Sequence, residues 1–69
     1  MDLLKKINNL PEQFPGTTNS KWIRLYFQSG KTALGYYNFK EEQWREFNDI
    51  RNLHNTSTID SKFLKGWHY

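Results

Sequence analysis

The stretch KWIRLYFQSGKTALGYYN, residues 21–38, decides the predicted fold. Residues 21–28 alternate between two faces, as a half-buried strand does. The dipeptide Ser29-Gly30 is suited to a two-residue turn, and residues 31–38 then return as a second strand. The apolar face of the first strand carries Ile23, Leu25 and Phe27. The sequence therefore predicts an antiparallel hairpin with one face turned to a core.

The turn length sets the register of this hairpin. With a two-residue turn, Gln28 pairs with Lys31 and Trp22 lies opposite Tyr37. The core face then also includes Leu34 and Tyr36. A slip of one residue would exchange the two faces, so the register is a hypothesis that depends on the turn.

The second face of the hairpin is the predicted binding site, because it combines aromatic rings with a basic side chain. Its residues are Trp22, Arg24, Tyr26 and Tyr37. Rings beside basic groups can stack on bases and contact phosphates. An exposed aromatic patch on a small domain is also typical of a protein contact. A third explanation is burial of this face, under a helix or in a homo-oligomer.

Residues 38–53 are predicted to form a helix. Asn38 and Glu41 have the spacing of an N-cap and its capping-box partner. Apolar residues recur every three positions, namely Trp44, Phe47, Ile50 and Leu53, and would form a broad apolar stripe. The alternative turns the chain at residues 40–42 and makes residues 43–47 a third strand.

The two ends of the chain complete the predicted fold. The first ten residues predict a short helix with Asp2 as its N-cap, and residues 62–69 predict a final strand that pairs with the hairpin. The expected fold class is α+β: a small antiparallel sheet of about three strands with one or two helices packed on it. Residues 1–69 are expected to form a single domain.

Composition narrows the classes of function. The 69 residues include no cysteine, which excludes disulfides and cysteine-ligated zinc, and the net charge is only +3. No segment approaches the roughly 18 apolar residues of a membrane span, and no signal peptide is evident, so a cytoplasmic location is expected. His54 and His68 lack partners at a ligand spacing, and no catalytic motif is present. We therefore expect no metal, no cofactor and no enzymatic activity.

Several short motifs resemble a family of short uncharacterised proteins carried by phages and prophages. They are Leu10-Pro11-Glu12, Gly30, Gly35-Tyr36-Tyr37-Asn38, Trp44 and the late Trp67. The resemblance implies an accessory protein of a mobile element that engages a host or defence component. It also favours a strand over a helix around Trp44.

The expected function is that of a small non-catalytic protein-binding module. The alternative is a nucleic-acid-binding domain that uses the aromatic and basic face of the sheet. The expected partner is accordingly a protein, with nucleic acid or a second copy of the chain as alternatives and no membrane.

Overall fold

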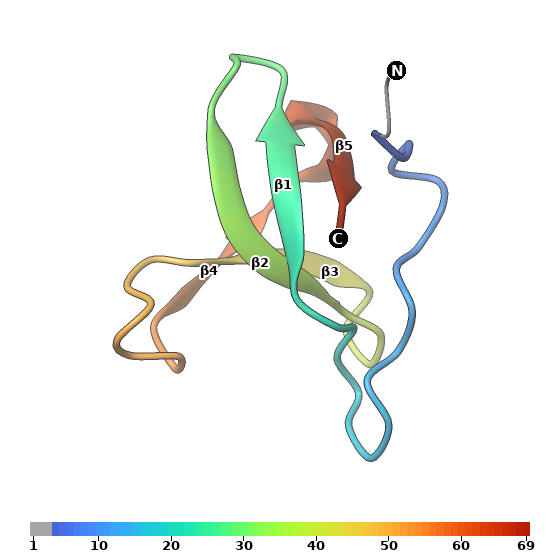
Figure 1. Cartoon of the computed structure of the whole chain (residues 1–69), viewed down its shortest axis with the longest axis vertical. Coiled ribbons are helices and arrows are strands. Elements are labelled where there is room, and N and C mark those ends of the chain that lie inside the picture. Colours follow the sequence, from blue (N-terminus) through green and yellow to red (C-terminus); the bar gives the residue numbers. More distant parts are fainter. Residues whose placement is uncertain (1–3) are drawn as a thin grey trace.

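A computed structural model describes residues 4–69 and shows an antiparallel sheet of five strands (Figure 1). In chain order they are β1 (Ile23–Phe27), β2 (Thr32–Asn38), β3 (Gln43–Phe47), β4 (Thr56–Ile59) and β5 (Leu64–His68), and a short 3-10 turn, η1 (Ser61–Phe63), precedes β5. In space the order is β4-β3-β2-β1-β5. The α+β prediction is wrong, because η1 is the only helical segment in the part of the chain that is described. No helix there is long and apolar enough to cross a bilayer.

The strand β2 changes its partners along its length. Its first half pairs with β1 and its second half with β3, and Gly35 is paired on both sides, with Ile23 and with Glu46. Figure 1 shows β2 curving strongly along its length. A Cβ atom at Gly35 would overlap the carbonyl oxygen of Arg45 and lie 2.7 Å from Cδ1 of Leu25. The missing side chain therefore lets β3 lie against β2 where the sheet bends.

The turn between β1 and β2 is one residue longer than predicted. The amide of Phe27 donates to the carbonyl oxygen of Lys31 (2.8 Å), and Gly30 donates to that of Phe27 (2.9 Å). Gly30 adopts φ 96°, as the last residue of a three-residue hairpin loop commonly does. Leu25 consequently pairs with Ala33 and not with Leu34. This slip exchanges the faces of β2, so that Tyr37 points to the core and Tyr36 to the outside.

The core lies on one face of the curved sheet, and every strand contributes to it. Its buried hydrophobic side chains are Ile23, Leu25, Tyr37, Trp44, Ile59, Leu64 and Trp67. Trp67 also satisfies its polar atom, because its indole Nε1–H donates to the carbonyl oxygen of Asn9 at 2.7 Å. A few large rings thus close the core of a chain that has no disulfide.

The helix predicted over residues 38–53 is absent, and the alternative third strand is correct. The amide of Glu41 does donate to Oδ1 of Asn38 (3.0 Å), but this bond closes the turn between β2 and β3. Glu42 then adopts a left-handed φ of 55°, which a helix excludes. Trp44 is buried opposite Tyr37, whereas Ile50 and Leu53 are exposed in the β3–β4 loop (residues 48–55).

The N-terminal segment consists of an isolated β-bridge and a turn, which contradicts the predicted helix. Asp2, the proposed N-cap, lies outside the described residues, and residues 4–10 contain no helix. Lys5 instead pairs with Trp67, donating to its carbonyl oxygen at 2.7 Å and accepting from its amide at 2.9 Å. The predicted pairing of the final strand with the hairpin is confirmed, since β5 lies antiparallel to β1.

Replacing Gly35 with alanine is expected to lower the free energy of unfolding by about 3 kcal/mol, because the new methyl group meets the backbone of β3. Gly30→Ala is the matched control. No atom lies within 4 Å of the position that its new methyl group would take, so only the positive φ opposes the change, at a cost of about 1 kcal/mol. Urea denaturation of both variants measures the difference, and equal losses would contradict the role given to Gly35.

Candidate binding surface

The side chains that point away from the core form the outer face of the sheet. Strand alternation and register place on it Trp22, Arg24, Tyr26, Leu34, Tyr36, Arg45 and Phe47. Trp22 directly precedes β1, and the others come from β1, β2 and β3. Three strands that are adjacent in the sheet therefore supply one continuous surface.

Two rings on this face pack against a third, and we call the three residues the outer aromatic cluster: Trp22, Tyr36 and Phe47. Phe47 is central, with ring centroids 4.9 Å from Trp22 and 5.4 Å from Tyr36. Trp22 and Phe47 belong to the segments on either side of β2, so their rings meet over that strand. Trp22 remains 48% exposed, so a large part of the indole is open to a partner.

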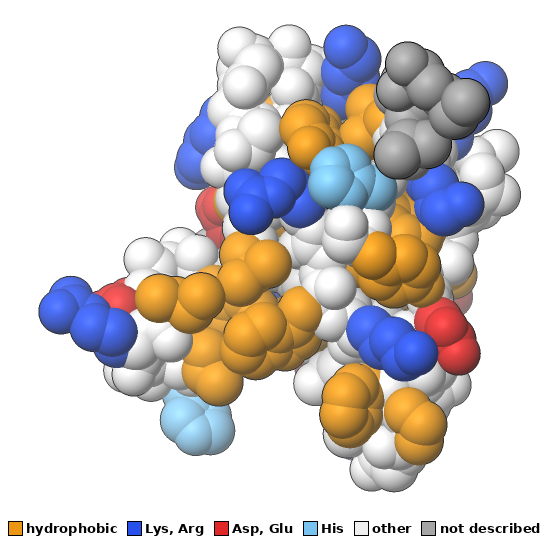
Figure 2. Space-filling model, viewed as in Figure 1, with side chains coloured by type: hydrophobic (Ala, Val, Ile, Leu, Met, Phe, Trp, Pro, Cys, Tyr) orange, Lys and Arg blue, Asp and Glu red, His pale blue; other side chains and the backbone are white. Residues whose placement is uncertain are grey.

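The β3–β4 loop extends the hydrophobic surface. Ile50 and Leu53 are both exposed there. Figure 2 shows hydrophobic side chains gathered in one patch over β2 and this loop. The loop is closed at its base by Asn48, whose amide donates to the carbonyl oxygen of Asn55 (2.9 Å) and whose side chain donates to Oγ of Ser57 (2.8 Å). Hydrogen bonds at the base therefore restrict the loop that presents Ile50 and Leu53 to solvent.

Two arginines add positive charge to the outer face. Arg24 is exposed, and its side chain makes no hydrogen bond or ion pair with any residue in the range 4–69. The guanidinium of Arg45 donates to Oγ1 of Thr56 (2.9 Å) and of Thr58 (2.6 Å), which are neutral groups. Within the described residues neither arginine has a carboxylate partner, so the face carries uncompensated positive charge beside its rings.

Tyr26 lies on the outer face as predicted, but at the β5 side of it. Its hydroxyl and Nε2 of His68 are 2.6 Å apart, and Nδ1 of His68 lies 2.6 Å from the main-chain oxygen of Tyr69. Nδ1 must donate to that oxygen, so in the neutral ring Nε2 accepts from the Tyr26 hydroxyl. Tyr26 is thus engaged with His68, while Trp22 is engaged with Phe47.

Tyr37, the fourth predicted binding residue, belongs to the core. Its ring packs edge-on against Trp44 at 4.9 Å and against Phe39 at 5.0 Å. Burial raises the pKa of Tyr37 above its ordinary value of 10.0, and the negative charge of Glu42 raises it further. The structure therefore brings Trp22, Arg24 and Tyr26 to one face and removes Tyr37 from it.

Sequence reasoning misses six residues of this surface, namely Leu34, Tyr36, Arg45, Phe47, Ile50 and Leu53. The two-residue turn wrongly places Leu34 and Tyr36 in the core. The predicted helix wrongly places Phe47, Ile50 and Leu53 in its buried stripe and takes Arg45 off the sheet. The alternative strand over residues 43–47 is the signal that could place Phe47 on the sheet.

The described residues offer no evident metal centre, since no group of three His, Asp or Glu side chains is close enough to hold an ion. Comparison of the chain with protein-family models, curated proteins and solved structures finds no match in any of the three. The resemblance to phage and prophage proteins therefore stays a prediction.

The buried phenol of Tyr37 predicts a loss of stability at alkaline pH. Its raised pKa means that the unfolded chain releases this proton first, so the stabilisation is complete below the unfolded pKa and is lost as pH rises through the folded pKa. Parent and Tyr37→Phe proteins should be unfolded in urea at several pH values from about 9 to about 11. The difference in unfolding free energy, parent minus variant, is expected to fall with pH. A difference that stays constant would contradict this account of Tyr37.

Proposed function

We propose that the protein is a non-catalytic protein-binding module whose contact surface is the outer aromatic cluster with the adjoining β3–β4 loop. The observation that carries the proposal is the half-exposed indole of Trp22, which rests on Phe47 beside a loop that exposes Ile50 and Leu53. Large apolar side chains gathered on one face are typical of a contact site, while single exposed ones are ordinary.

The composition of this surface matches the centre of a protein interface. Tryptophan, tyrosine and arginine dominate the binding energy of such interfaces, and lysine and glutamate are depleted in them. Here Tyr36 is paired with Arg45, and Arg24 lies two positions from Trp22 on the same face of the sheet. The rings are already packed against Phe47, so little side-chain freedom is lost on binding. The two arginines favour a partner with acidic groups around an apolar centre.

The nucleic-acid alternative uses the same arginines and rings. Stacking on bases requires open aromatic faces. The patch, however, continues into the aliphatic side chains of Ile50 and Leu53, which offer no ring to a base, and the removal of Tyr37 to the core takes away one predicted stacking ring. These features favour a protein partner. The resemblance to phage proteins would make that partner a host or defence protein in the cytoplasm.

Two leucines with similar exposure allow a matched test of the surface. Leu53 on the β3–β4 loop is 45% exposed, and Leu10 on the N-terminal segment is 48% exposed. Tagged parent, Trp22→Ala, Leu53→Ala and Leu10→Ala proteins should be used to capture partners from a bacterial lysate, with and without nuclease. We expect a stoichiometric protein band that survives nuclease and is retained by Leu10→Ala.

Binding is then measured with the purified partner. Trp22→Ala is expected to weaken it by more than about tenfold, because a central aromatic residue carries much of the binding energy of an interface. Leu53→Ala is expected to weaken it by less, because Leu53 lies beside that centre. Circular dichroism should show that all variants keep the fold, because these side chains lie outside the core. Unchanged binding by both variants would exclude this surface. Recovery of nucleic acid, with binding that falls steeply as salt rises, would instead support the alternative.

A further inference from the structure

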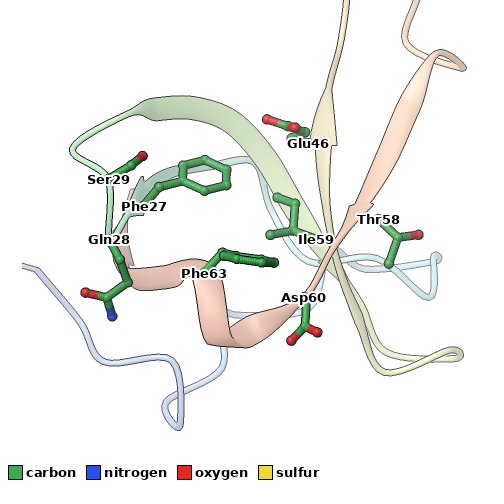
Figure 3. A pocket seen from close by; sticks show the side chains of 8 residues that line it. All are labelled: Phe27, Gln28, Ser29, Glu46, Thr58, Ile59, Asp60 and Phe63. Atoms are coloured by element: carbon green, nitrogen blue, oxygen red, sulfur yellow. The ribbon is translucent and has the colours of Figure 1, made fainter.

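A cavity of about 420 Å³ lies between the β1–β2 turn and η1 (Figure 3). The rings of Phe27, from β1, and Phe63, from η1, line it, and the buried side chain of Ile59 reaches toward them from β4. The carboxylates of Glu46 and Asp60 lie on opposite sides of the cavity. Glu46 and Ile59 point to the core face of the sheet, so this cavity is separate from the outer aromatic cluster.

Each of the two rings already attracts a cation of the chain. The ammonium nitrogen of Lys31 lies 5.2 Å from the ring centroid of Phe27, and that of Lys62 lies 5.2 Å from the ring centroid of Phe63. The same two nitrogens approach the carboxylates, at 3.6 Å from Glu46 and 3.9 Å from Asp60. The cavity thus holds two pairs, each of a ring and a carboxylate, and both pairs are suited to positive charge.

Glu46 has unused capacity to accept hydrogen bonds. Its side chain is only 18% exposed, and Lys31 is its one ion-pair partner in the described part of the chain. The separation of 3.6 Å is too long for a hydrogen bond, and no other described group donates to this carboxylate. A partly buried carboxylate beside an apolar cavity, with its lone pairs available, is suited to a ligand that brings several N–H donors in one plane.

We infer that this cavity binds the guanidinium group of an arginine side chain from a partner polypeptide. A guanidinium is planar, stacks on aromatic faces, and can donate two parallel hydrogen bonds to a carboxylate such as Glu46. A lysine ammonium is more strongly hydrated and lacks the paired donors. Free arginine is disfavoured, because its α-carboxylate would lie beside the like-charged carboxylates of Glu46 and Asp60 that line the cavity.

Lys31 and Lys62 compete for the same groups, but only weakly. Both side chains are mostly exposed, and neither donates a side-chain hydrogen bond to its carboxylate. Because each lysine is mostly solvated and lies beyond hydrogen-bond distance of its carboxylate, these pairs stabilise the protein little, and an incoming guanidinium displaces Lys31 from the partly buried Glu46 at small cost. Loss of the Glu46 carboxylate should therefore weaken binding of the guanidinium, whereas loss of the Lys31 ammonium should strengthen it.

The probe for the test is Nα-acetyl-L-arginine amide, in which both backbone charges are blocked, and the readout is amide chemical shifts of the full chain. We expect weak, saturable binding that shifts residues around the cavity. Glu46→Gln is expected to weaken this binding by about tenfold, whereas Lys31→Ala is expected to strengthen it by about twofold. Glu41→Gln, which removes the same charge at the exposed β2–β3 turn, is the matched control and should leave binding unchanged.

Two further ligands test whether the cavity prefers the arginine side chain of a polypeptide to free arginine or to lysine. Free L-arginine and Nα-acetyl-L-lysine amide are both expected to bind more weakly than the blocked arginine. Tighter binding of free arginine would overturn the assignment to a polypeptide partner. Shifts remote from the cavity, or equal binding by the parent protein and Glu46→Gln, would overturn the site itself. The outcome is independent of the proposed function, since Trp22→Ala alters the other face of the sheet and leaves the cavity intact.

Discussion

The close approach of β3 to β2 at Gly35 is the constraint on which the rest of the structure depends. A side chain at this position would occupy the space of the Arg45 carbonyl group, and β3 would be forced away from the bend. Because the strands meet there, Trp44 can close the core opposite Tyr37. The same bend brings Phe47 from one side of β2 against Trp22 from the other. One missing Cβ atom thus positions both the core and the candidate binding surface.

The sequence predicts a strand correctly where the side chains alternate clearly between two faces. Residues 21–28 alternate clearly, and β1 lies within them. Residues 38–53 could not be assigned in this way, because Trp44, Phe47, Ile50 and Leu53 at intervals of three fit one side of a helix equally well. In the structure these side chains occupy the core, the outer face and a loop. Only the long-range pairing of β3 with β2 and β4 distinguishes the two outcomes.

The candidate surface was predictable only in part, because the face of a strand depends on its register. Trp22, Arg24 and Tyr26 lie on one face of the segment that contains β1, and this does not depend on the register of β2. Tyr37 reaches that face only if the turn has two residues, and the left-handed Gly30 makes it three. No local sequence pattern predicts the cavity between Phe27 and Phe63, because its rings and carboxylates come from segments that are distant in the sequence. Sites assembled across strands in this way require the topology to be known first.

The pairing of β1 with β5 has a consequence for how the chain folds. The contact between Tyr26 and His68 spans 42 positions, and the bond from Trp67 to Asn9 spans 58. A hairpin such as β1–β2 closes within microseconds, whereas contacts between distant segments first require a large loss of chain entropy. We therefore expect the buried Trp67 to reach its place late, with the core face of β1 exposed until then. Folding slower than that of a helical chain of equal length follows from this topology, and the interval before β5 docks is when the molecule is most open to aggregation.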